Sequence, residues 1–256
     1  MRAKNFRTFF FLYGRYLQYD LIHSLEQEIG IGRNVDLLIH FREFFKMIIS
    51  SDIQEQEAKE GFENLKTDIK NYIGDKKQEC LDIQLDKIRH STFNYDLLLE
   101  KDFKDLLSDF CVSCGDFKFI DNIESKNSQE FEKDKHGRSV LVQSLLEFNN
   151  ALSHIFISVY HGNDKLKNIE KAKNHLYRGT IDNYKMFIRI SFELLKKNTK
   201  LFQKFKNIRI EELLQLGKDI HHKKIEDYYL HLEYKELYNE CVFMFKEDQS
   251  NSQTQH

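Results

Sequence analysis

The sequence contains no proline, and glycine is sparse, at 10 of 256 residues. About a dozen prolines would be usual for this length, because proline makes up about 5% of an average protein. Proline breaks an α-helix and glycine weakens one. A chain with so few of both can run through long helices with few enforced turns.

Long apolar runs are missing as well. No segment reaches the roughly 18 consecutive apolar residues that a membrane-spanning helix needs, and the mean hydropathy is -0.59. Residues 1–18 place basic side chains before a short apolar run, as a secretory signal does, but Arg15 interrupts the run and no small-residue cleavage site follows. We interpret this start as an amphipathic helix and expect a cytoplasmic protein that makes no membrane contact.

Several function classes find no support in the sequence. Four cysteines in 256 residues do not indicate a disulfide scaffold, and a formal net charge of -2 gives no overall attraction to nucleic acid. The chain has no Walker loop and no G-x-G-x-x-G, H-E-x-x-H or G-x-S-x-G motif. These absences disfavour P-loop hydrolases, Rossmann dehydrogenases and α/β-hydrolases, and we expect no cofactor.

Apolar residues recur at helical spacing over most of the chain, which predicts an all-α helical bundle. We place an N-terminal helical region at residues 1–110, a C-terminal region built on a long αα-hairpin at 139–247, and a polar disordered tail at 248–256. Glycine, asparagine and aspartate interrupt the helical pattern between residues 111 and 138. We expect that segment to be a linker, or an insertion with short irregular or β structure.

The second helix of the hairpin carries the stretch KAKNHLYRGTIDNYK. Its ionisable residues fall at steps of four, three, four and three, which places them on one stripe of a helix: Lys171, His175, Arg178, Asp182 and Lys185. An antiparallel first helix would bring its own polar residues toward this stripe: Glu147, Asn150 and His154. A histidine beside a carboxylate and an arginine can serve in acid–base chemistry or bind a phosphate. Charged helix faces are usually solvent faces, however, so we expect the stripe to face water.

This hairpin, with the pattern K-A-x-N-H-L-x-R-x-x-x-D-x-Y-K on its second helix, is similar to hairpins of uncharacterised bacterial proteins. Over residues 145–190 it also resembles the helical bundles of HEPN proteins, and this implies a place in a toxin–antitoxin or antiviral system. Ribonucleases of that group carry four to six residues between an arginine and a histidine, and RNVDLLIH at residues 33–40 fits this spacing. In that case His40 would be the general acid or base at a ribose 2′-hydroxyl, and Arg33 would stabilise the charge on the phosphorane.

A second candidate site is CVSC, in which Cys111 and Cys114 have C-x-x-C spacing. Such a pair can supply half of a zinc site or form a redox couple. No second C-x-x-C or H-x-x-x-H pair exists in the sequence, and the strand that precedes a redox motif is missing. We therefore interpret these cysteines as ordinary thiols at a helix end and expect no metal.

A third candidate is a run of basic residues over 185–209, a segment that contains one acidic residue, Glu193. It begins at Lys185 and continues with Arg189, Lys196, Lys197, Lys200, Lys204, Lys206 and Arg209. The local excess of positive charge could contact RNA or DNA through the phosphate backbone. A solvated helix face with its aromatic residues turned inward explains the same run equally well.

These patterns favour a non-catalytic helical interaction or regulatory component, with a protein partner or a second copy of the chain as its partner. The bacterial defence or toxin–antitoxin setting is implied by the resemblance alone. The alternatives are a metal-independent HEPN-type endoribonuclease and a protein that binds nucleic acid or nucleotides through the basic run and the hairpin stripe.

Overall fold

The computed structural model describes residues 2–26, 34–50, 53–74, 81–116, 131–133, 135–136, 139–162, 164–216 and 229–253. They form an all-α helical bundle, as the sequence predicted, with one two-stranded β-ribbon. No helix in this part of the chain combines the length and the apolarity that crossing a membrane requires.

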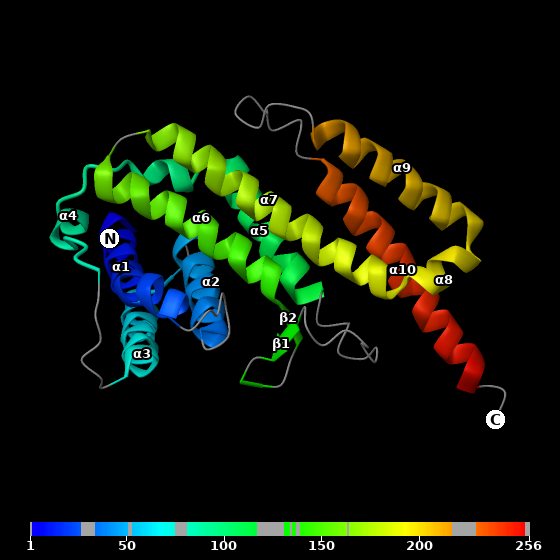
Figure 1. The fold of residues 1–256 in the computed structure, drawn as a ribbon, viewed down its shortest axis with the longest axis horizontal. Helices are drawn as coiled ribbons and strands as arrows, with labels where there is room; N and C mark the ends of the chain where they lie inside the picture. Colours follow the sequence, from blue (N-terminus) through cyan, green and yellow to red (C-terminus); the bar gives the residue numbers. More distant parts are fainter. Residues whose placement is uncertain are drawn as a thin grey trace.

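A long antiparallel hairpin of α6 (Val142–His161) and α7 (Lys165–Ile190) runs through the molecule (Figure 1). Gly162 ends α6 with a φ of 71°, a left-handed conformation that glycine adopts without steric cost. Its backbone N–H donates to the carbonyl oxygen of Ser158 at 3.0 Å. This cap allows the tight connection that places the two helices side by side.

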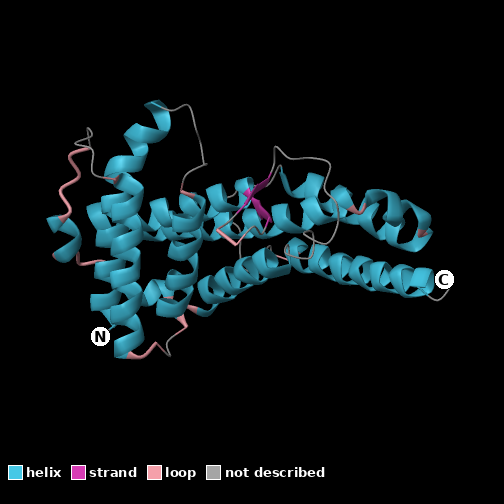
Figure 2. Cartoon of the chain, turned by 90° about the horizontal axis from the view of Figure 1, so that it is seen from below, coloured by secondary structure: helices cyan, strands magenta, loops and turns pink. Residues whose placement is uncertain are grey.

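Three N-terminal helices gather at one end of the hairpin, and α1 stands steeply across it (Figure 2). They are α1 (Arg2–Glu26), α2 (Val35–Ile49) and α3 (Glu55–Ile73). Aromatic rings join α1 to α2, since the ring centroid of Phe9 lies 5.7 Å from that of Phe41 and 5.1 Å from that of Phe45. The Tyr13 hydroxyl lies 2.8 Å from both the Asn149 Oδ1 and the Ser153 Oγ of α6, which ties α1 to the hairpin.

Helix α5 (Lys101–Asp116) packs on α7 where α7 has a glycine. A Cβ atom at Gly179 would lie 2.6 Å from the ring of Phe110 and 3.3 Å from the Cβ of Glu147. The missing side chain therefore lets α5 and α6 both approach α7 closely at this level. The short helix α4 (Asp86–Arg89) and the 3-10 helix η1 (Tyr95–Leu98) precede α5 in the chain.

The segment predicted as a linker or insertion contains short β structure. Strand β1 (Phe131–Lys133) pairs antiparallel with β2 (Ser139–Leu141), which leads directly into α6. Helix α5 continues past the predicted boundary at residue 110 as far as Asp116, because Phe110 and Ser113 keep its buried face in contact with the core. Residues 117–130 lie outside the described part of the chain.

The opposite end of the hairpin carries α8 (Phe192–Lys197), α9 (Thr199–Leu216) and α10 (Leu230–Gln253), at the right of Figure 1. We call α9 and α10 together the α9–α10 arm. Helix α10 packs against both α7 and α9, and the ring of Tyr238 lies 4.5 Å from that of Phe187. The last turns of α10, residues 248–253, belong to the segment for which the sequence predicted a disordered tail.

Candidate functional site

The polar stripe of α7 lies against neighbouring helices over most of its length. The Nδ1 atom of His175 is 2.5 Å from the Oε2 atom of Glu147 on α6, and the two side chains are 19% and 10% exposed. Gln143, one turn earlier on α6, donates from its Nε2 atom to the other carboxylate oxygen of Glu147 at 3.1 Å. The expectation that this stripe faces water is therefore wrong at His175.

A second histidine extends the contact between the two helices. The ring of His154 on α6 stacks on that of His175, with 5.2 Å between centroids and 19° between planes. Burial, with the nearby His175 and Lys171, lowers the pKa of His154, so its ring stays neutral where a free histidine would begin to protonate. Its buried Nδ1 atom has no hydrogen-bond partner in the described part of the chain.

Farther along the stripe, the partners come from the α9–α10 arm. The Nζ atom of Lys185 is 2.8 Å from the Oε1 atom of Glu212 on α9 and 4.0 Å from the Oδ1 atom of Asp182. Burial, reinforced by the carboxylates of Glu147 and Glu212, raises the pKa of Asp182, while Lys185 acts in the opposite direction. Hydrogen bonds from Lys185 and Tyr234 outweigh burial at Glu212 and hold its pKa below the ordinary value.

The remaining predicted residues of the stripe differ in exposure. Arg178 and Asn150 are exposed, so neither takes part in the buried contacts, and Lys171 is partly exposed. The expected solvent exposure is thus found fully at Arg178 and in part at Asp182 and Lys185, whose side chains are 30% and 26% exposed, and least at His175. His154 and Glu147 both contact His175, and Asp182 and Glu212 lie near Lys185, about two to three helical turns further along α7. The two histidines and three carboxylates therefore form two separate groups.

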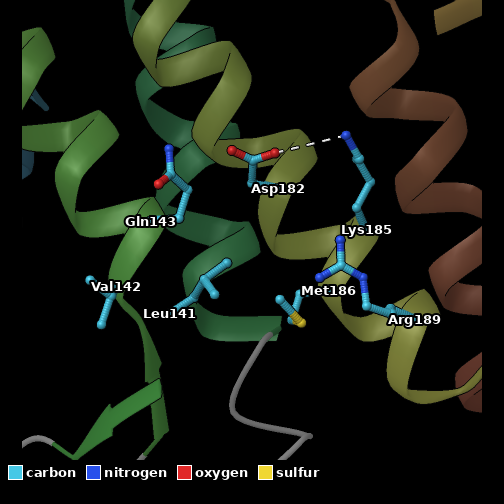
Figure 3. Close-up of a pocket in the computed structure, with 7 residues that line it drawn as sticks. All are labelled: Leu141, Val142, Gln143, Asp182, Lys185, Met186 and Arg189. Carbon is cyan, nitrogen blue, oxygen red and sulfur yellow. Dashed lines mark ion pairs between the residues drawn. The ribbon is translucent and has the colours of Figure 1, made fainter. Parts of the chain in front are cut away.

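A cavity of about 530 Å³ opens beside Asp182 and Lys185 (Figure 3). It lies between the start of α6 and the second half of α7. Its walls combine apolar, amide and charged side chains: Leu141, Val142, Gln143, Asp182, Lys185, Met186 and Arg189. A volume of this size is typical of small-molecule sites.

The predicted ribonuclease pair is described only in part. Arg33 lies outside the described residues. His40 lies on α2 with a side chain that is 26% exposed, and its Nδ1 atom is 2.6 Å from the Oδ2 atom of Asp68 on α3. A carboxylate on one ring nitrogen orients a histidine and leaves the other nitrogen for a second partner.

Carboxylates within the molecule neutralise part of the basic run. Lys185 contacts Glu212, as described above, and Lys204 contacts Glu240 of α10 at 2.5 Å. Arg209 also contacts Glu212. Lys196 pairs with Glu193, and the side chains of Arg189, Lys196, Lys197, Lys200 and Lys206 are all exposed. The positive charge open to a phosphate backbone is therefore smaller than the sequence indicated, and nucleic-acid contact stays a prediction.

Cys111 and Cys114 lie in the last turns of α5, where the sequence placed a helix end. Burial raises the pKa of the Cys111 thiol to about 12, so it stays protonated at neutral pH. The Cys114 sulfur accepts a hydrogen bond from the Asn183 amide at 3.4 Å. Within the described residues, no three histidine, cysteine or acidic side chains are placed to hold a metal ion.

Two contacts of this region escaped the sequence reasoning. Lys173, 8% exposed, is buried between α7 and α5 with its Nζ atom 2.7 Å from the Oδ2 atom of Asp102. Glu212 enters from α9, 27 residues beyond Lys185. No local sequence pattern predicts either contact. The four-residue spacing of Gln143 and Glu147, in contrast, indicates that their side chains can form a hydrogen bond on one helix.

Comparison with family models, curated proteins and solved structures found no match to this chain. Its class rests on the fold, which defines an all-α helical bundle protein with a central hairpin.

Proposed function

We propose that this chain is a non-catalytic helical interaction component that pairs with a second copy of itself through the α9–α10 arm. One observation carries the proposal. Three large apolar side chains follow one another on the last turns of α9 and are mostly exposed: Ile210 at 57%, Leu213 at 66% and Leu214 at 63%. On α10, Leu232 and Phe243 are exposed as well. Grouped apolar exposure of this kind is typical of protein-binding surfaces.

The charges of the arm favour a second copy as the partner. Helix α9 holds four basic and two acidic residues, a formal charge of +2. Helix α10 holds two basic and five acidic residues, a formal charge of -3. Within one chain Lys204 of α9 already pairs with Glu236 and Glu240 of α10, whereas Lys200 and Lys206 of α9 are exposed. In a twofold dimer, α9 of each copy would face α10 of the other, so that these exposed lysines meet acidic side chains and the exposed apolar side chains meet one another.

Contacts between helices support a scaffold role for the hairpin. Glu147 with His175 joins α6 to α7, and Glu212 with Lys185 joins α9 to α7. The second of these contacts holds the α9–α10 arm on the hairpin. We extend the proposal to a bacterial defence or toxin–antitoxin setting on the resemblance of residues 145–190 to HEPN bundles alone.

Changing Leu213 and Leu214 to glutamate tests the proposal. We expect the unmodified chain to elute as a dimer in light scattering after size-exclusion chromatography, and the Leu213→Glu/Leu214→Glu double variant to elute as a monomer, because two buried carboxylates without partners oppose association. Leu166→Glu is the matched control, since Leu166 is 68% exposed on α7 away from the arm. A double variant as dimeric as the control would contradict the assigned surface.

The contact of His40 with Asp68 favours one second candidate, the HEPN-type ribonuclease. We expect such an enzyme to degrade RNA in EDTA and to lose that activity in His40→Ala, because the reaction would lose the general base for the ribose 2′-hydroxyl or the general acid for the leaving oxygen. His90→Ala, at an exposed histidine, is the control. RNA that stays intact with the unmodified protein, or degradation that survives in His40→Ala, rules this candidate out.

A further inference from the structure

The cavity between the start of α6 and the second half of α7 combines features that the proposed dimer does not use. Its apolar wall is formed by Leu141, Val142 and Met186, with Leu141 and Met186 only 4% and 8% exposed. Its polar side is formed by charged groups of both signs on α7 and by the Gln143 amide (Figure 3). An apolar wall with a few convergent polar groups is the usual composition of a ligand site.

The negative group of this cavity is only weakly compensated. Asp182 makes no hydrogen bond through its side chain in the described part of the chain, and its nearest cation, Lys185, is 4.0 Å away. Lys185 makes its shorter contact, 2.8 Å, with Glu212. The raised pKa of Asp182 has the same origin, because burial and two neighbouring carboxylates disfavour its ionised form. A ligand ammonium group would supply the missing positive charge.

The positive groups follow Asp182 on the same side of α7. Lys185 and Arg189 come three and seven residues later, so both line the cavity beyond the carboxylate. A guanidinium carries five N–H donors and an ammonium three, so each can receive an anionic oxygen besides a partner within the protein. The Gln143 amide gives an N–H to Glu147 and also lines the cavity.

We propose that this cavity binds a small zwitterion of the α-amino acid class with an apolar side chain. The ammonium group would lie against Asp182, and the carboxylate against Lys185 and Arg189. The side chain would cover Met186 and the Leu141–Val142 wall. A simple carboxylic acid brings no cation to Asp182, and a simple amine makes no contact with Lys185 and Arg189, so each uses only one end of the cavity.

Isothermal titration calorimetry with L-phenylalanine tests this site. We expect saturable binding that weakens at least about tenfold for phenethylamine, which lacks the carboxylate, and for 3-phenylpropionate, which lacks the amine. A phenethylamine or 3-phenylpropionate that binds as tightly as the amino acid overturns the proposal. So does the absence of binding for L-leucine, L-methionine and L-phenylalanine alike.

Variants locate the binding within the molecule. Asp182→Asn and Arg189→Gln should each weaken L-phenylalanine binding about tenfold or more, whereas Glu193→Gln, at an exposed position outside the cavity, should leave it unchanged. Because ionised Asp182 is disfavoured in the folded state, Asp182→Asn should unfold at the same temperature as the unmodified chain or higher, so lost binding cannot reflect lost structure. Unchanged binding in both cavity variants overturns the assignment. The result is independent of the dimer, which the Leu213→Glu/Leu214→Glu variant tests separately.

Discussion

Phe110→Ala is expected to lower the free energy of unfolding by about 3–5 kcal/mol, the usual cost of removing a buried phenylalanine. Phe110 is 0% exposed and stacks on Phe148 of α6, with 5.9 Å between ring centroids. Its ring also fills the space that the missing side chain of Gly179 leaves on α7. The substitution therefore opens a cavity where α5, α6 and α7 meet.

Urea unfolding measures this effect, with Leu166→Ala as the control. Leu166 is 68% exposed, so its truncation should change the free energy of unfolding by less than about 0.5 kcal/mol. A cost at Phe110 as small as that of the control would mean that the three helices do not depend on this contact.

Lys173→Met is expected to lower the free energy of unfolding by about 3 kcal/mol, because it leaves the Asp102 carboxylate buried without its cation. The Asp102 side chain is 12% exposed, so water compensates it poorly. Lys167→Met, at an exposed lysine of the same helix, should be nearly neutral. Removing both charges in Lys173→Met/Asp102→Leu should restore more than half of the loss. A double variant that adds the two single losses would show that the ions do not act as a pair.

The pH dependence gives an independent check on the same pair. Although burial opposes it, the hydrogen bonds that Lys173 donates to the carboxylates of Asp102 and Glu170 raise its pKa above the ordinary 10.5. A raised folded-state pKa stabilises the folded state fully below 10.5, and this contribution is lost as pH rises through the higher folded-state value. The difference between the unmodified chain and Lys173→Met should therefore stay constant from neutral pH up to about 10.5 and shrink as the pH rises further through the folded-state pKa.

The helices were predictable because their signal is local. Buried residues of α7 such as Ala172, Leu176 and Phe187 repeat at helical spacing, which predicts one helix over about residues 165–197, and the helix does begin at Lys165. Its end was wrong, since α7 stops at Ile190 and α8 begins after Ser191. Ser191 is itself 2% exposed, and no proline or glycine marks the break.

The environment of the polar stripe was not predictable in the same way. Spacing along one helix indicates pairs such as Arg178 with Asp182, at four residues. The close contacts of His175 and Lys185 are instead to Glu147 and Glu212, on other helices. Which face of α7 receives those helices depends on how the apolar faces of all the helices pack, and one sequence does not specify it. The cavity beside Asp182 results from that packing and has no sequence signal of its own.

Sedimentation equilibrium of the unmodified chain tests the central claim, self-association through the α9–α10 arm, most directly. The single chain has a mass of 30.8 kDa. We expect the average mass to rise with protein concentration toward twice that value and to level off there, because a twofold dimer closes on itself. An average mass that stays at that of one chain across the concentration range would contradict the account.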